Sequence, residues 1–181
     1  MKPLDMRDIS IIDAFPVYGC SKIVLNVGCG EGRIDQGIQA MEYMIYSTDI
    51  KEPDCIRRDY GLPLKWSYNF SKADIFDLSS FPVKSAPIVI CSQVLEHLRD
   101  WELALSNLIK LTEVRLIITV PYMKSFHSPD HINFWGDGDT WLFESLCSPY
   151  SVAISKIRTK PEDVERHQWC YLIVVDKRQS E

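Results

Sequence analysis

Three glycines and two aspartates stand at positions that suit the binding of a nucleoside. Gly28, Gly30 and Gly32 alternate directly after a short apolar run, and a helix-like segment follows them. Glycine accepts a positive φ and lets the main chain approach a ligand closely, while the N-terminus of a helix points free N–H groups at the same place. Asp49 ends the next apolar run, where a carboxylate can bind both ribose hydroxyls, and Asp74 precedes a third run, where a carboxylate can meet the exocyclic amine of adenine. The ordered set predicts an adenosine pocket at the carboxyl edge of a parallel sheet.

A second group of reactive side chains lies in residues 120–135, VPYMKSFHSPDHINFW, which include the end of another apolar run and the loop after it. Loops at that edge of an α/β sheet carry substrate contacts. Because the pKa of histidine is near neutral, His131 is the first candidate for a general base and His127 the second, and Asp130 can orient the ring. The competing interpretation is that these imidazoles cap helices or pack under Trp135.

No metal site is expected in this region. A ligand pair of His127 and His131 would need both rings on one face of a helix, and Ser128-Pro129 opposes a helix there. His97, beside Glu96, is a lesser candidate for the base, with core packing as the alternative. Four aromatic residues form either a stacking wall for an acceptor or part of the core: Tyr122, Phe134, Trp135 and Trp141.

The elements that must position these residues alternate between strand-like and helix-like segments, which is typical of a doubly wound α/β domain. The predicted strands are residues 22–27, 43–48, 88–91, 114–120, 151–157 and 169–175. The predicted helices are residues 33–41, 94–111 and 139–146. Residues 51–72 contain Pro53, Gly61 and Pro63 and are predicted as a loop-rich segment in place of a helix. No linker composition divides the chain, so a single domain over residues 1–181 is expected.

Composition narrows the class of protein further. The chain has 181 residues and a formal net charge of −5, which fits one domain and disfavours binding of nucleic acid through bulk electrostatics. No apolar run approaches the roughly 18–20 residues that span a bilayer, and residues 1–8 lack an apolar signal core. The six cysteines include no CxxC pair, so neither a zinc site nor a disulfide framework is favoured. Free thiols and a cytoplasmic location are expected, with no membrane attachment.

Four segments resemble the motifs of class I S-adenosylmethionine-dependent methyltransferases: VLNVGCGEG at 24–32, STDI at 47–50, KADIFDL at 72–78 and IVICSQVLEHL at 88–98. The resemblance implies a Rossmann-like methyltransferase fold, with a doubly wound, mostly parallel sheet and an antiparallel C-terminal strand. It also implies S-adenosyl-L-methionine as the cofactor. The glycine loop would hold its methionine part, Asp49 its ribose and Asp74 its adenine. The residues that the resemblance places at the cofactor are Asn26, Gly28, Cys29, Gly30, Asp49, Ile50, Asp74, Ile75, Ser92 and Gln93.

One departure from that family concerns affinity. Asn26 stands where the family usually has Asp or Glu, so a charge near the cofactor is lost and weaker binding is expected. The amino-methyltransferase signature [DN]PP[FYW] is absent after residues 88–91, which disfavours methylation of a nucleobase amine. Arg33 replaces the last glycine of the dinucleotide fingerprint, which disfavours a nicotinamide-dependent oxidoreductase.

The expected function is methyl transfer to an oxygen or nitrogen atom of a small molecule or glycan. The alternative is a catalytically reduced methyltransferase-like chain that serves as a binding or partner subunit. Because no sizeable substrate domain is inserted, the acceptor site is shallow or is completed by a partner or by a second copy in a homodimer.

Overall fold

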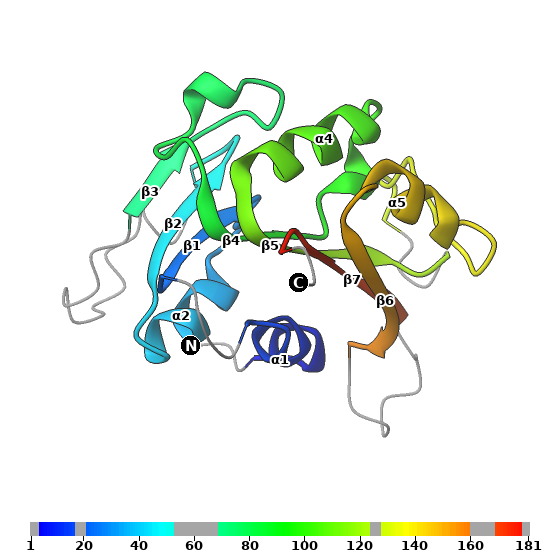
Figure 1. Cartoon of the computed structure of the whole chain (residues 1–181), viewed down its shortest axis with the longest axis horizontal. Coiled ribbons are helices and arrows are strands. Elements are labelled where there is room, and N and C mark those ends of the chain that lie inside the picture. The colour runs from blue at the N-terminus through cyan, green and yellow to red at the C-terminus, as the bar shows by residue number, and fades with distance from the viewer. Residues whose placement is uncertain (1–3, 17–20, 53–68, 124–127, 160–168, 179–181) are drawn as a thin grey trace.

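A central sheet organises the molecule (Figure 1). The computed structural model describes residues 4–16, 21–52, 69–123, 128–159 and 169–178. In this part of the chain seven strands lie in the order β3-β2-β1-β4-β5-β7-β6. They are β1 (Ile23–Val27), β2 (Met44–Asp49), β3 (Asn69–Lys72), β4 (Ala86–Ser92), β5 (Thr112–Pro121), β6 (Ser151–Arg158) and β7 (Trp169–Asp176). β1 to β5 pair in parallel, and β7 runs antiparallel to both of its neighbours.

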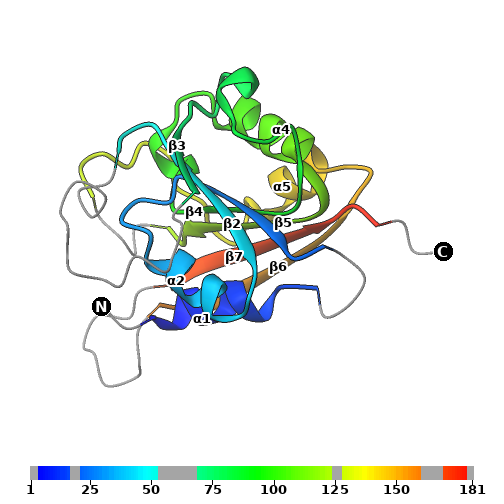
Figure 2. The same ribbon diagram turned by 90° about the vertical axis from the view of Figure 1, so that its left-hand side faces the viewer.

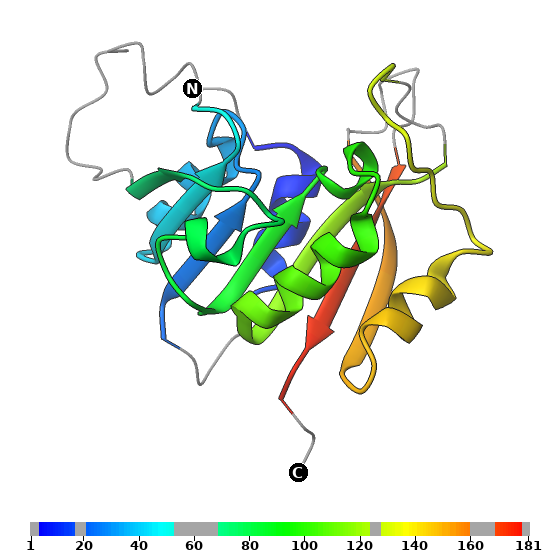
Figure 3. The same cartoon turned by 90° about the horizontal axis from the view of Figure 1, so that it is seen from above.

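Helices cover both faces of this sheet, α1 and α2 on one side and α4 and α5 on the other (Figures 1 and 3). Their bounds are α1 Met6–Asp13, α2 Arg33–Ala40, α4 Trp101–Leu111 and α5 Thr140–Leu146, with 3₁₀ turns η1 (Leu78–Ser80) and η2 (Leu95–His97). Each face has its own apolar core. Leu105 and Phe143 belong to the core under α4 and α5, and Ile11 and Ile38 to the core under α1 and α2.

The central strands are hydrophobic nearly throughout because both of their faces are covered. In β4 every residue from Ala86 to Cys91 is buried, and only Ser92 at its carboxyl end is partly exposed. The sheet is twisted, as Figure 2 shows by the crossing of β2 and β7 in that view. Because β1 to β5 are parallel, their carboxyl ends lie at one edge of the sheet, and the loops after these five strands begin there.

The predicted fold class is confirmed, and each of the six predicted strands is present. The single helix predicted over residues 94–111 is wrong: η2 ends at His97, Leu98 is extended, and α4 begins at Trp101. Leu95 and Leu98 matched the helical period because both pack toward the core from a turn. The predicted loop over residues 51–72 is also wrong at its end, because Asn69–Lys72 form the edge strand β3; residues 53–68 lie outside the described part.

Helix α1 was not predicted, although its start carries a local signal. Asp5 and Asp8 form a reciprocal capping box, in which each carboxylate accepts the main-chain N–H of the other residue at 3.0 Å. Among the described cysteines, Cys91, Cys147 and Cys170 are buried free thiols.

Candidate active site

The glycine loop between β1 and α2 has the conformation that its sequence predicts. Gly28, Gly30 and Gly32 have φ values of 73°, 52° and 67°, in the left-handed region that favours glycine. The N–H groups of Gly28 and Cys29 donate to the Thr48 carbonyl at 2.8 and 3.0 Å, which ties the loop to the end of β2. The loop is therefore a fixed turn at the carboxyl edge of the sheet.

Two of these glycines are needed for different reasons. A Cβ on Gly28 would lie 2.3 Å from Cγ2 of Val94, so packing against the segment after β4 excludes a side chain there. A Cβ on Gly30 would have no heavy atom within 4 Å. Gly30 thus faces open space, and a ligand can approach its main chain directly.

Asp49 meets this loop from the end of β2. Its Oδ2 accepts the Gly30 N–H at 3.0 Å, and its Oδ1 accepts the Lys51 N–H at 3.2 Å. The main-chain carbonyl of Asp49 accepts the Ala73 N–H at 3.0 Å, which brings the start of the segment after β3 to the same edge. Ile50 is exposed beside Asp49.

Asp74 lies in that segment, two residues beyond the register partner of Asp49. Its Oδ1 accepts the Phe76 N–H at 3.0 Å, and the side chain is half-buried, while Ile75 packs into the core. The two carboxylates predicted for the nucleoside therefore stand at the ends of adjacent strands.

Asn26 is held inside the domain. Its side chain is buried, and its Nδ2 donates to Asp35 Oδ1 at 2.6 Å, while Ser47 Oγ donates to the other carboxylate oxygen at 2.7 Å. Asp35 is fully buried in α2, so a carboxyl group is hydrogen-bonded to the side chain of Asn26 although β1 itself lacks an acid. Asp35 is not among the site residues predicted from the sequence. The available signal was an acid between Ile34 and Ile38 on the apolar face of that helix.

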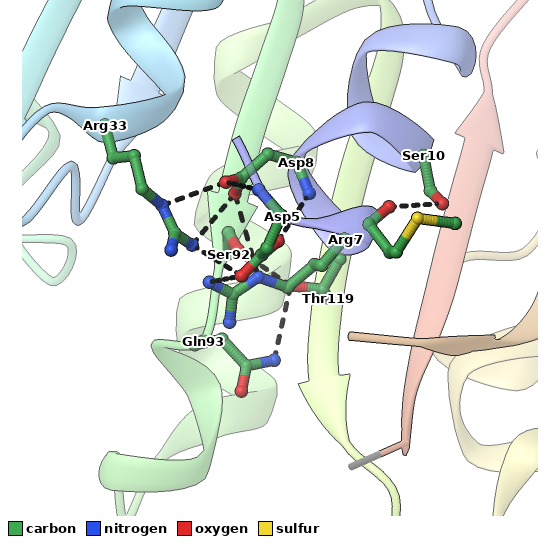
Figure 4. A network of polar contacts seen from close by, with 9 residues as sticks. Asp5, Arg7, Asp8, Ser10, Arg33, Ser92, Gln93 and Thr119 are labelled. Atoms are coloured by element: carbon green, nitrogen blue, oxygen red, sulfur yellow. Dashed lines mark hydrogen bonds and ion pairs between the residues drawn. The ribbon is translucent and has the colours of Figure 1, made fainter. Parts of the chain in front are cut away.

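The end of β4 is joined to β5 by a polar network. Ser92 Oγ and Thr119 Oγ1 are 2.8 Å apart, and the Gln93 N–H donates to the Thr119 carbonyl at 2.9 Å. The Gln93 side-chain amide donates to Thr119 Oγ1 at 3.3 Å (Figure 4). The main chain of Gln93 has a φ of 58°. This turn fixes the direction in which the chain leaves β4 toward η2.

Arg33, which follows the glycine loop, links α2 to the N-terminal helix (Figure 4). Its guanidinium lies 2.9 Å from a carboxylate oxygen of Asp5 and 2.9 Å from one of Asp8. Asp8 is buried, and burial is the main cause that raises its pKa, with the nearby Asp5 charge adding to the effect. The arginine that breaks the dinucleotide fingerprint is thus a tether for α1, a role that the sequence analysis did not predict.

The loop after β5, which carries the predicted acceptor residues, docks on η2. The N–H groups of Ile132 and Asn133 donate to the Glu96 carbonyl at 2.8 and 3.1 Å, and the Asn133 amide donates to the Leu95 carbonyl at 3.0 Å. His131 lies on this loop, half-buried, with its ring 4.7 Å from that of His97 in an edge-to-face contact. The second predicted base, His127, lies outside the described residues.

Asp130 is placed next to His97. Its Oδ2 is 3.3 Å from Nδ1 of His97, and its main-chain oxygen is 3.2 Å from the same nitrogen. A hydrogen bond from Ser128, and then the imidazoles of His97 and His131, lower the pKa of Asp130. The carboxylate predicted to orient His131 therefore contacts the neighbouring imidazole.

Glu96 is fully buried beside these rings. In the part of the chain that the structure describes, neither of its carboxylate oxygens has a hydrogen-bond partner. Burial raises the pKa of Glu96 to about 8, and the positive charge of Arg7 partly opposes this effect. At neutral pH the carboxyl group is therefore mostly protonated unless a cation lies beside it.

The predicted aromatic wall is only partly exposed. Trp135 is buried and packs edge-to-face on Trp101, with ring centroids 5.4 Å apart, so it belongs to the core. Phe134 and Trp141 are exposed, and the Tyr122 hydroxyl donates to Asp137 at 2.9 Å.

Comparisons with known proteins show similarity to methyltransferases in sequence and in fold. Residues 25–114 match the family described as a methyltransferase domain. A stretch of 80 residues is 30% identical to the ubiquinone biosynthesis O-methyltransferase of Hahella chejuensis. This match covers 44% of this chain and 34% of that enzyme. The chain thus matches about a third of the length of that curated relative.

Solved structures share the fold over nearly the whole chain. A SAM-dependent methyltransferase from Archaeoglobus fulgidus has a TM-score of 0.69 at 21% identity, covering 94% of this chain and 91% of that one. The magnesium protoporphyrin IX methyltransferase of Synechocystis, solved with bound SAH, has a TM-score of 0.68 at 16% identity, covering 95% and 80%. The N-methyltransferase NodS of Bradyrhizobium japonicum, in complex with S-adenosyl-L-homocysteine, has a TM-score of 0.69 at 16% identity, covering 96% and 86%. Within the described residues, no helix is both long and apolar enough to cross a membrane.

Proposed function

The chain belongs to the class I S-adenosylmethionine-dependent methyltransferases, and from this membership we propose that it transfers a methyl group to an oxygen or nitrogen atom of a small molecule or glycan. The observation that carries the proposal is the meeting of Gly30 and Asp49. Gly30 faces open space, and its main-chain nitrogen lies 3.0 Å from Oδ2 of Asp49 at the carboxyl edge of the sheet. Such an edge is where open α/β sheets bind nucleotides.

The residues of this edge fit S-adenosylmethionine. The glycine loop and Cys29 would hold the methionine part, Asp49 and Ile50 the ribose, and Asp74 and Ile75 the adenine. Ser92 and Gln93 would line the side nearest the acceptor. When bound, the cofactor supplies a sulfonium-activated methyl group, so the protein has to align the acceptor and accept its proton.

Asn26 bears on how tightly the cofactor binds. Its amide already donates to Asp35, 2.6 Å away, so the buried carboxyl group of this region stands on α2 and not on β1. We infer that the carboxyl group of Asp35, through its hydrogen bond with Asn26, takes over part of the role that an acid at position 26 would have. The affinity is then reduced but not abolished.

His131 serves as the proton acceptor in this proposal. It lies on the loop after β5, and that loop is fixed on η2 by hydrogen bonds to the Glu96 carbonyl. The same loop carries the exposed Phe134, which can contact an apolar part of the acceptor. The acceptor would therefore enter between the ends of β4 and β5.

Calorimetric titration with S-adenosylmethionine and S-adenosylhomocysteine tests the proposal first. Binding of both is expected, with Asp49→Ala as the weakened variant and Asp77→Ala, whose exposed carboxylate caps η1, as a matched control. Absence of binding to either compound would leave only the alternative of a partner subunit. Incubation of metabolite and oligosaccharide pools with methyl-labelled cofactor then identifies the acceptor by its gain of one labelled methyl group.

A further inference from the structure

Glu96, His97 and His131 bring three metal-ligand groups together on the acceptor side. One ligand atom from each residue lies within 4.8 Å of the other two. The residues come from η2 and from the loop after β5, and the hydrogen bonds from Ile132 and Asn133 to the Glu96 carbonyl hold these segments together. The cluster is therefore a product of the scaffold and not of one flexible loop.

The state of Glu96 is a second, independent observation. Its carboxylate is fully buried, and neither oxygen has a hydrogen-bond partner among the described residues. Buried carboxylates are usually paired with a cation, hydrogen-bonded or bound to a metal ion. Arg7 is the basic residue whose charge acts on Glu96, but its guanidinium is placed at 3.5 Å from Asp5 and 3.9 Å from Asp8. A bound cation would supply the partner that the carboxylate lacks.

The surroundings of His97 suit a metal ligand. Its Nδ1 lies 3.3 Å from the carboxylate of Asp130 and 3.2 Å from the Asp130 carbonyl. Histidines bound to metals commonly donate their other ring N–H to a carboxylate or a carbonyl, which fixes the tautomer and the ring orientation. In this arrangement Nδ1 of His97 carries the proton and Nε2 is left for the metal.

We propose that Glu96, His97 and His131 bind one divalent transition-metal cation, such as Zn²⁺ or Mn²⁺, beside the cofactor pocket. One carboxylate and two imidazoles favour such ions over Mg²⁺ and Ca²⁺, which prefer oxygen ligands. Bond lengths of about 2.1 Å place tetrahedral ligand atoms roughly 3.4 Å apart. Side-chain rotations that move the ligand atoms by about an ångström would therefore bring all three within bonding distance of one ion. Three protein ligands leave a coordination position open. The site differs from the expectation of no metal, which considered only a pair of His127 and His131.

The role of this ion rests on the proposed function and narrows it to an oxygen acceptor. A hydroxyl of the acceptor takes the open position, and the positive charge lowers its pKa, so that its proton is released to water. The oxygen lone pair then forms the new O–C bond as the S–CH₃ bond breaks, and that electron pair stays on sulfur. In this scheme His131 promotes deprotonation as a ligand of the ion and takes the place of the free proton acceptor of the proposed function, so His131→Ala lowers turnover in either role.

The test measures metal binding apart from activity. The full chain is treated with EDTA, dialysed and titrated calorimetrically with Zn²⁺, Mn²⁺ or Mg²⁺, and Co²⁺ is added to record its visible absorption. We expect one equivalent of Zn²⁺ or Mn²⁺ to bind, with Mg²⁺ weaker, and the Co²⁺ spectrum to indicate nitrogen ligands. Binding of none of the ions, or tighter binding of Mg²⁺ than of Zn²⁺ and Mn²⁺, would overturn the assignment.

Variants identify the ligands. Glu96→Gln and His97→Asn should each weaken Zn²⁺ binding by at least about 100-fold, and Asp130→Asn by roughly 10-fold. Glu102→Gln, an exposed carboxylate on α4, is the matched control and should bind like the wild type. If Glu96→Gln and His97→Asn both bind Zn²⁺ as tightly as the wild type does, this cluster is not the metal site. His97 is exposed, so its variant keeps the test valid if Glu96→Gln fails to fold.

Titration with S-adenosylhomocysteine, run on the same variants, separates this proposal from the proposed function. Retained cofactor binding together with lost metal binding supports the site. Cofactor binding without any metal binding in the wild type refutes the metal site alone. Metal binding without cofactor binding refutes the proposed function and leaves the site standing.

Discussion

Substituting two glycines of the same loop separates packing from cofactor contact. In Gly30→Ala the new Cβ has no heavy atom within 4 Å, so only the residue's φ of 52° opposes the change, at about 1–2 kcal/mol. In Gly28→Ala the Cβ also lies 2.3 Å from Val94 Cγ2, and the repacking brings the total to about 2–5 kcal/mol. Urea denaturation of the free proteins measures both costs. Gly28→Ala should be the less stable variant.

Cofactor affinity is the second measurement, and there Gly30→Ala, the more stable variant, should show a loss. If the cofactor fills the space at Gly30, overlap with the added Cβ costs about 1–3 kcal/mol, a fall of roughly 5- to 150-fold in the affinity for S-adenosylhomocysteine. Gly138→Ala, where a Cβ also meets no atom within 4 Å, is the control and should match the wild type in stability and affinity. Wild-type affinity in a folded Gly30→Ala variant would refute the placement of the cofactor. Equal stability of the Gly28 and Gly30 variants would refute the packing argument.

Four further predictions concern charges. Asn26→Asp should lower the free energy of unfolding at pH 7 by about 2–4 kcal/mol, because two buried carboxylates would then face each other at the present 2.6 Å contact with Asp35; an unchanged denaturation midpoint with tighter cofactor binding would contradict this. Asp49→Ala should weaken cofactor binding by about 1–3 kcal/mol in calorimetry, because the ribose loses a charged acceptor. His131→Ala should leave cofactor binding nearly intact while turnover falls by roughly 10²–10⁴, and equal turnover would remove His131 from the mechanism. Hydrogen bonds from two tyrosine hydroxyls lower the pKa of Asp137 below its ordinary 3.8, so its contribution to stability is present above that pH and is lost as the pH falls through the lower, folded-state pKa. Asp137→Asn should therefore lower the melting temperature at pH 7, and the difference should shrink below about pH 4; a difference independent of pH would argue against the carboxylate.

The sequence by itself determined the features that are local. Buried parallel strands read as apolar runs because both of their faces are covered, so β1, β4 and β5 were predicted close to their observed bounds. The alternating glycines predicted a turn at positive φ, since that backbone conformation is strained for residues with a side chain. The position of Asp49 at the carboxyl end of β2 was predicted because it ends an apolar run. Edge strand β3 escaped prediction because it has only four residues and none of them is buried, so no apolar run marks it.

Only the tertiary structure decided which distant polar groups meet. Packing between separate elements brings three pairs of polar residues together: Asn26 with Asp35, Arg33 with Asp8, and Glu96 with His131. No period or motif along the chain encodes those contacts. The helix predicted over residues 94–111 shows the same limit, because apolar spacing records which side chains are buried and not which backbone path buries them. Local propensity and burial depend on the type of each residue and its neighbours in the sequence. The charge and ligand environment of a site depends instead on chain segments that only folding brings within a few ångströms.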